Sequence, residues 1–123
     1  RMGLWAPAWD SRIKASVSNC GCVNYRNSMR RVSGVQAEFC VPGIMQHGDM
    51  EDILRLAAPR AVLIQATTDD VWSDNAQELY SAARSSFPEG HLRLKLWPGG
   101  HQFTPEMRAS AYDFLDQWLS GGH

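Results

Sequence analysis

Two carboxylates and one histidine occupy positions in the sequence where they could carry out hydrolytic chemistry. Asp69 and Asp70 follow the apolar run at residues 61–65, and His101 follows a second strand-like run at 92–97. A carboxylate can orient an imidazole through its Nδ1 proton and leave Nε2 free as a general base. Each residue alone is more often a turn former or a surface residue. An acid and then a histidine, each placed directly after a strand, is a more specific pattern.

The segments around these residues alternate between strand and helix patterns. Such alternation is typical of a parallel α/β sheet, in which ligands and catalytic groups gather at the carboxyl ends of the strands. If the strands that precede Asp69 and His101 are neighbours, both side chains lie on one edge of the sheet. The predicted strands are 13–18, 61–65 and 92–97, and the predicted helices cover 4–9, 50–57, 76–87 and 105–119.

Caps and apolar spacing define these predicted helices. Asp49 is the expected N-cap of the second helix, and Ser73 or Asp74 of the third. The first helix is expected to be buried. The last helix should begin with Pro105 at its first position. Its predicted buried stripe consists of Met107, Ala111, Phe114, Leu115, Trp118 and Leu119.

Residues 19–48 are predicted to form a long connection or lid-like segment, with a short helix near residues 25–32. Connections of this length tend to be functional or flexible. All three cysteines lie in it, and the spacing of Cys20 and Cys22 differs from that of a Cys-x-x-Cys redox or zinc pair. A metal site that also uses Cys40 and His47 is less expected than buried thiols. The sequence therefore predicts neither a metal site nor a cofactor.

Composition excludes several classes of function. The 123 residues carry 12 basic and 13 acidic side chains, so no bulk charge is available to hold nucleic acid. No apolar run approaches the roughly 20 residues that a membrane span needs. The glycines before His101 do not form a phosphate-binding loop. The even charge balance fits a neutral small molecule as well as any other partner.

Several motifs resemble those of a known family. The segment 66–73 reads Ala-x-x-Asp-x-x-Trp-Ser, which is similar to the acid loop of α/β-hydrolases, and Trp-Pro-Gly-Gly-His at 97–101 is similar to their histidine loop. Asp-Ser-Arg-Ile-Lys-Ala at 10–15 resembles the dienelactone hydrolase and acetylxylan esterase-like branch. The resemblance implies a parallel-sheet α/β-hydrolase fold. Residues 1–123 would be its C-terminal part, with about three strands and flanking helices.

The family's nucleophile elbow, Gly-x-Ser-x-Gly, does not occur in the sequence. The family pattern places it a few residues before Gly3, which is upstream of Arg1. Ser28 and Ser33 are poor substitutes, because neither follows a buried strand or has flanking glycines. The expectation is therefore that the chain carries two of three triad members and is inactive alone.

The resemblance implies a serine-type hydrolase of small carboxylic esters, with acetylated carbohydrates among the candidate substrates. His101 would be the base, and the motif spacing favours Asp69 over Asp70 as the acid. Trp72 either lines a substrate pocket or packs the next helix, and His47 is either a substrate contact or a plain loop residue. Two alternatives remain: a fragment of a prolyl-oligopeptidase-type peptidase, which shares both loops, and a non-catalytic α/β module.

Overall fold

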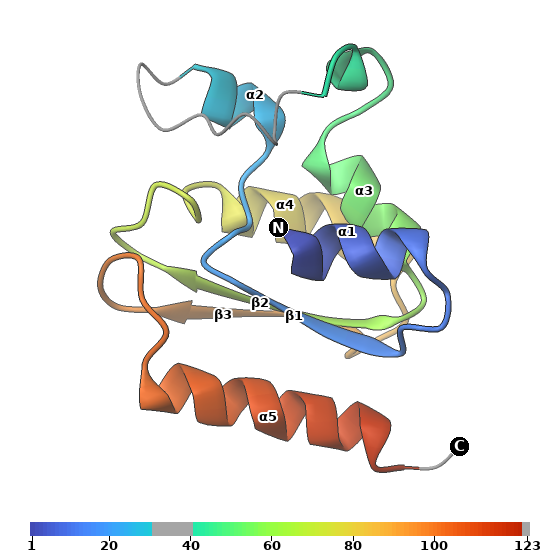
Figure 1. Ribbon diagram of the computed structural model, residues 1–123, viewed down its shortest axis with the longest axis vertical. Coiled ribbons are helices and arrows are strands. Elements are labelled where there is room, and N and C mark those ends of the chain that lie inside the picture. Colours follow the sequence, from blue (N-terminus) through green and yellow to red (C-terminus); the bar gives the residue numbers. More distant parts are fainter. Residues whose placement is uncertain (31–40, 122–123) are drawn as a thin grey trace.

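A three-stranded parallel sheet organises the chain, as the computed structural model shows for residues 1–30 and 41–121. The strands are β1 (Ala15–Asn19), β2 (Ala61–Thr67) and β3 (Leu92–Trp97), and they lie in the order β1-β2-β3. Strand β2 pairs in parallel with both β1 and β3, and the arrowheads of β2 and β3 point to the same end of the sheet (Figure 1). The prediction of a parallel α/β sheet is confirmed, and β2 and β3 are neighbours as expected.

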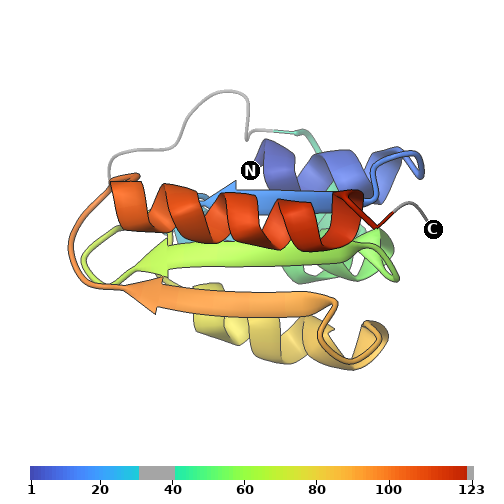
Figure 2. The same cartoon turned by 90° about the horizontal axis from the view of Figure 1, so that it is seen from below.

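Helices cover both faces of this sheet. Helix α5 covers one face, while α1, α3 and α4 share the other (Figures 1 and 2). The short helix α2 and a 3₁₀ turn at Ile44–Gln46 lie in the connection between β1 and α3. The helices are α1 (Met2–Trp9), α2 (Tyr25–Met29), α3 (Met50–Ala57), α4 (Ala76–Ala83) with a 3₁₀ turn at Arg84–Ser86, and α5 (Pro105–Leu119).

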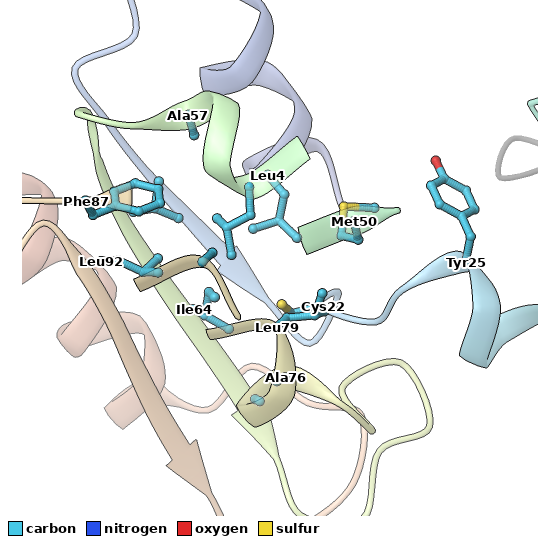
Figure 3. Packing of buried hydrophobic residues seen from close by; sticks show 14 residues of the cluster. Leu4, Cys22, Tyr25, Met50, Ala57, Ile64, Ala76, Leu79, Phe87 and Leu92 are labelled. Atoms are coloured by element: carbon cyan, nitrogen blue, oxygen red, sulfur yellow. The ribbon is translucent and has the colours of Figure 1, made fainter. Parts of the chain in front are cut away.

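The central strand β2 packs against the helices on both faces of the sheet, and every one of its residues is buried. Val62 and Ile64 point into a cluster with α1, α3 and α4 that includes Leu4, Leu54 and Leu79 (Figure 3). Leu63 points the other way and packs with Phe114 of α5. A continuous apolar strand is what a sheet covered on both faces requires.

The N-cap of helix α3 is Asp49, as predicted. The Asp49 carboxylate accepts the Met50 backbone N–H at 2.7 Å, and the Asp49 backbone N–H donates to the Asp52 carboxylate at 2.9 Å. The same carboxylate also accepts the backbone N–H of Tyr25 at 2.6 Å and of Arg26 at 3.0 Å. One buried side chain thus fixes the start of both α2 and α3.

The N-cap of helix α4 is Asn75, so the prediction of Ser73 or Asp74 as its cap is wrong. The Ser73 hydroxyl is engaged elsewhere, because it donates to Asp70 Oδ2 at 2.9 Å. The Asp74 carboxylate accepts from the Asn27 side chain at 3.3 Å. Ser73 therefore holds the loop after β2 together from within, and Asp74 connects this loop to α2.

Two predicted apolar positions lie at the surface. Helix α1 was expected to be buried, yet Trp9 is 89% exposed, because the helix packs against β1 and α3 on one side only. In α5, Leu119 is exposed while Trp118 packs against His91 with ring centroids 4.4 Å apart. Successive helical residues point about 100° apart, so Leu119 is turned away from the sheet.

The connection at 19–48 is partly described. The predicted helix near residues 25–32 is the shorter α2, and Cys20 and Cys22 are buried free thiols, as expected. Ser33 and Cys40 lie outside the described residues. Among the helices that the structure describes, none is both long and apolar enough to cross a membrane.

Candidate active site

An acid and a histidine meet at the carboxyl end of the sheet. His101 Nδ1 lies 3.1 Å from Asp70 Oδ2 and 3.2 Å from Asp70 Oδ1. The Asp70 side chain is 1% exposed and the His101 side chain 62% exposed. The carboxylate is thus enclosed by protein, while the imidazole presents its other side to solvent. Within the described residues, His101 Nε2 has no hydrogen bond, so it is available to a reacting group.

Hydrogen bonds from its own loop and from His101 keep the Asp70 carboxylate ionised. Burial alone would raise the pKa of Asp70, but the Trp72 backbone N–H at 3.1 Å, the Ser73 hydroxyl at 2.9 Å and His101 all donate to it. Together these bonds hold the pKa of Asp70 below its ordinary value. A carboxylate that stays ionised is the partner that a protonated Nδ1 requires.

The structure pairs His101 with Asp70 and not with Asp69, which corrects the preference drawn from motif spacing. Asp69 is the last residue after β2 that continues the backbone pairing with the segment after β3. Its backbone N–H donates to the Gly99 carbonyl at 2.9 Å. Its side chain is exposed and lies 3.4 Å from the Thr68 hydroxyl. The turn that begins at Asp70 carries the carboxylate inward, toward the ring.

The histidine loop is joined to the acid loop by backbone contacts. The Thr68 N–H donates to the Trp97 carbonyl at 3.0 Å, and the Thr68 hydroxyl accepts the Gly99 N–H at 3.3 Å. Gly99 has a φ of +106°, and a Cβ there would lie 2.6 Å from Gln102 Nε2. Only glycine adopts this turn without strain, so the residue that the sequence pattern singled out has a steric role.

The first strand also contributes to the site, which the sequence analysis missed. The Asn19 side chain donates to the Gln102 carbonyl at 3.0 Å, and the Cys20 thiol lies 3.3 Å from the same oxygen. These contacts attach the residue after His101 to the end of β1. The available signal was positional, because Asn19 is the last residue of a strand of the sheet and Cys20 follows it.

The other predicted site residues are not brought together with this pair. Trp72 is half-buried, and its backbone N–H contacts Asp70. His47 is exposed at the end of the 3₁₀ turn, which lies beyond α3 and away from the loops that carry the pair (Figure 1). Ser28 is buried in α2, where its hydroxyl accepts from Arg1 Nη2 at 3.0 Å. It has neither the position nor the neighbours of a nucleophile.

An apolar groove of about 700 Å³ lies along α1, and Trp5, Trp9 and Ile13 are among the residues that line it. The Asp70–His101 pair is not part of its lining. The pair therefore lies outside this groove, at the carboxyl end of the sheet. This groove belongs to the face on which Trp9 is exposed.

The pair has the geometry of a general base with its orienting acid. An ionised carboxylate on Nδ1 fixes the tautomer and stabilises the imidazolium that forms when Nε2 takes a proton. Such a pair can activate a hydroxyl nucleophile or a water molecule.

The chain is similar to known proteins in sequence and in fold. The chain is 26% identical to the carbohydrate esterase MZ0003 from an unknown prokaryotic organism, over an alignment that covers 99% of this chain and 37% of that protein. A solved promiscuous CE15 esterase from a marine bacterial metagenome superposes with a TM-score of 0.68 at 24% identity, covering 95% of this chain and 39% of the other. The α/β-hydrolase GrgF from Penicillium sp. sh18 superposes at 0.55 with 13% identity, covering 96% and 60%.

These likenesses confirm the predicted fold and the resemblance to the esterase-like branch of the α/β-hydrolases. No family model matches the chain. The chain spans little more than a third of the length of the curated relative, at 37%.

Proposed function

We propose that this α/β-hydrolase chain provides the acid and the base of a serine-type carboxylic ester hydrolase. The observation that carries the proposal is the contact of 3.1 Å between the exposed ring of His101 and the buried carboxylate of Asp70. Strand ends β2 and β3 supply one residue each, in the order acid then histidine. This is the order in which the two residues follow the nucleophile in α/β-hydrolases.

In the proposed reaction, His101 Nε2 takes the proton of a serine hydroxyl as the serine oxygen attacks the acyl carbon. The imidazolium then gives this proton to the departing alcohol oxygen, which leaves an acyl-serine. Water attacks the acyl-serine by the same route and releases the carboxylic acid. Asp70 remains ionised throughout and stabilises the imidazolium.

We further propose that the attacking serine lies outside the 123 residues. Supporting this, a Cβ built on Gly21 would lie only 2.7 Å from the Arg1 backbone nitrogen, so Arg1 lies beside the turn that follows β1. A residue joined to that nitrogen would sit at the same sheet edge as His101, directly ahead of α1. A turn into a helix N-terminus is where this fold carries its nucleophile.

For the substrate we propose a small carboxylic ester of a carbohydrate. Support comes from the curated relative, which is named a carbohydrate esterase, and from the open edge at which His101 is exposed. Trp72 adjoins the acid and is proposed as a wall of the substrate site. His47 would contact only a substrate that extends as far as the 3₁₀ turn.

The experiment is ester hydrolysis by a version of the protein in which a nucleophile-bearing segment is joined ahead of Arg1. The corresponding part of the curated relative is one source of this segment. Release of p-nitrophenol from p-nitrophenyl acetate and of acetate from acetylated sugars would be measured. We expect activity that His101→Gln abolishes, with unchanged circular dichroism because the ring is exposed.

Equal activity in the His101→Gln version would refute the assignment of the base. Activity of the 123 residues alone that is lost on Ser28→Ala would refute an external nucleophile. No hydrolysis of any ester by a folded, extended version would favour a non-catalytic module. Cleavage of peptides but not of esters would favour the peptidase alternative.

A further inference from the structure

A third reactive side chain adjoins the acid and the histidine. The Sγ atom of Cys20, a carboxylate oxygen of Asp70 and a ring nitrogen of His101 all lie within 4.8 Å of one another. The mechanism proposed above gives this thiol no part in the chemistry. Cys20 is buried, and its φ of +48° is a left-handed conformation that residues other than glycine rarely adopt.

We propose that Cys20, Asp70 and His101 form a binding site for a thiophilic divalent cation such as Zn²⁺. Three protein ligands from three strand ends would leave a fourth position open to water. That ligand number is typical of zinc sites that keep an exchangeable position.

The distances are compatible with this ligand set. Ligand bonds of about 2.0–2.3 Å place the donor atoms of a tetrahedral zinc site roughly 3.3–3.8 Å apart. The carboxylate and Nδ1 are already 3.1 Å apart, and a thiol at the limit of 4.8 Å has to approach by roughly 1–1.5 Å. The exposed His101 side chain provides the freedom for this adjustment.

Charge and hydrogen bonding also favour the cation. A thiolate and a carboxylate together neutralise a dication, which limits the cost of placing it at a partly enclosed site. The thiol proton passes to solvent when the cation binds, so binding is stronger at higher pH. The Gln102 carbonyl then loses its thiol donor but keeps the Asn19 amide at 3.0 Å.

The donor types select among cations. Thiolate and imidazole suit Zn²⁺ and Co²⁺, whereas Mg²⁺ and Ca²⁺ prefer sites made of oxygen alone. The metal alone is therefore a sufficient probe, and Co²⁺ reports directly on sulfur ligation through its near-ultraviolet charge-transfer absorption.

The consequence for catalysis rests on the proposed function. A cation bound to Nδ1 displaces the Nδ1 proton, which otherwise donates to Asp70. The Asp70 carboxylate then binds the cation instead. Nε2 must then carry the remaining ring proton and can no longer act as a base. Zn²⁺ is thus an inhibitor of the hydrolase, and its removal by a chelator restores activity.

The test is a Co²⁺ titration of the 123-residue chain under reducing conditions, with Cys20→Ser, His101→Gln and Cys22→Ala. Cys22 is the matched control because it is a second buried thiol close by, yet it packs in the apolar cluster on the helix side. Burial raises the pKa of the Cys22 thiol to about 12, which makes it a poor ligand.

We expect one equivalent of Co²⁺ with sulfur charge-transfer absorption in the unmodified chain and in Cys22→Ala. Cys20→Ser should lose that absorption, and both ligand variants should bind more than about tenfold more weakly, since even outer-shell partners contribute that much. Absorption that persists in Cys20→Ser, absorption lost in Cys22→Ala, or no binding to the folded unmodified chain would each overturn the site. Circular dichroism establishes that every variant is folded, and His101→Gln tests the site at an exposed position if Cys20→Ser does not fold.

This titration involves no turnover, so its outcome is independent of the proposed function. In a hydrolytically active version, Zn²⁺ should inhibit the Cys22→Ala protein and spare Cys20→Ser. Hydrolysis without metal binding would refute the cation site alone. Metal binding without hydrolysis by any version would refute only the catalytic proposal.

Discussion

Replacing Asp70 by asparagine should invert the proton arrangement on His101. Asp70 accepts from three donors, but asparagine has a single acceptor oxygen. The Trp72 backbone N–H at 3.1 Å cannot turn away, so the amide oxygen has to remain at the Oδ1 position. The amide nitrogen then occupies the Oδ2 position, 2.9 Å from the Ser73 hydroxyl, which can rotate to accept, and 3.1 Å from His101 Nδ1.

An amide nitrogen donates, so His101 Nδ1 must become the acceptor and Nε2 must carry the proton. The expected loss of esterase activity is about 10⁴-fold, the cost of the wrong tautomer in a comparable triad. Stability should fall far less, by about 1–3 kcal/mol, because one charge-assisted bond is lost while the backbone contacts of the loop remain.

Two measurements check this prediction. The ¹⁵N shifts of the His101 ring report the tautomer in the 123-residue chain itself, and p-nitrophenyl acetate hydrolysis by the extended version reports activity. Asp69→Asn is the matched control, with stability expected within about 0.5 kcal/mol because the side chain is exposed. An unchanged tautomer in Asp70→Asn, or a loss of activity confined to Asp69→Asn, would refute the reasoning.

The Asp70→Asn substitution should also change how the free energy of unfolding depends on pH in acid. Because the pKa of Asp70 is lowered in the folded protein, its ionised form stabilises the fold. The advantage of the unmodified chain over Asp70→Asn should be complete above about pH 4, the ordinary range of the carboxyl. It should disappear as the pH falls through the lowered value. Urea unfolding at a series of pH values measures it, and a difference that is independent of pH between 2 and 6 would contradict it.

Four further substitutions test the scaffold by urea unfolding of the 123-residue chain. Gly99→Ala should cost about 1–3 kcal/mol, since φ is +106° and the new Cβ would lie 2.6 Å from Gln102 Nε2; a neutral effect would show that the turn relaxes freely. Asp49→Asn should cost about 2–4 kcal/mol, because the buried carboxylate caps two helices at once, and a cost below 1 kcal/mol would argue against this dual role. Ile64→Ala should cost about 3–4 kcal/mol, as a fully buried residue of the central strand, whereas Trp9→Ser, at an 89% exposed position, should stay near zero. The opposite ranking of these last two would contradict the assignment of the core.

Periodicity was sufficient to predict the sheet because burial leaves a direct trace in the sequence. The continuous apolar run of β2 and the half-exposed alternation of β3 follow from their central and edge positions. The N-cap at Asp49 was equally readable, since a carboxylate followed three residues later by Asp52 is a local motif.

The choice between Asp69 and Asp70 depended on geometry that motif spacing does not carry. The decisive contacts are the turn at Asp70 and its bond with Ser73, which also explains why Ser73 is not the cap of α4. An acid followed three residues later by a serine was a usable signal for an inward-facing turn. The approach of Cys20 had only the positional signal of a strand end, because it depends on the packing of β1 beside β2.

The two halves of the site depend on very different spans of the chain. Asp70 is held by bonds to Trp72 and Ser73, two and three residues away. The carbonyl that follows His101 is held by Asn19 and Cys20, 83 and 82 residues away. Contacts across short spans form early in folding, and contacts that close long loops form late. The acid turn should therefore be in place before the sheet is complete, while the base takes its position only once β1 has joined. A partly folded chain would then hold its carboxylate ready without an aligned imidazole, so that reactivity would mark the end of folding.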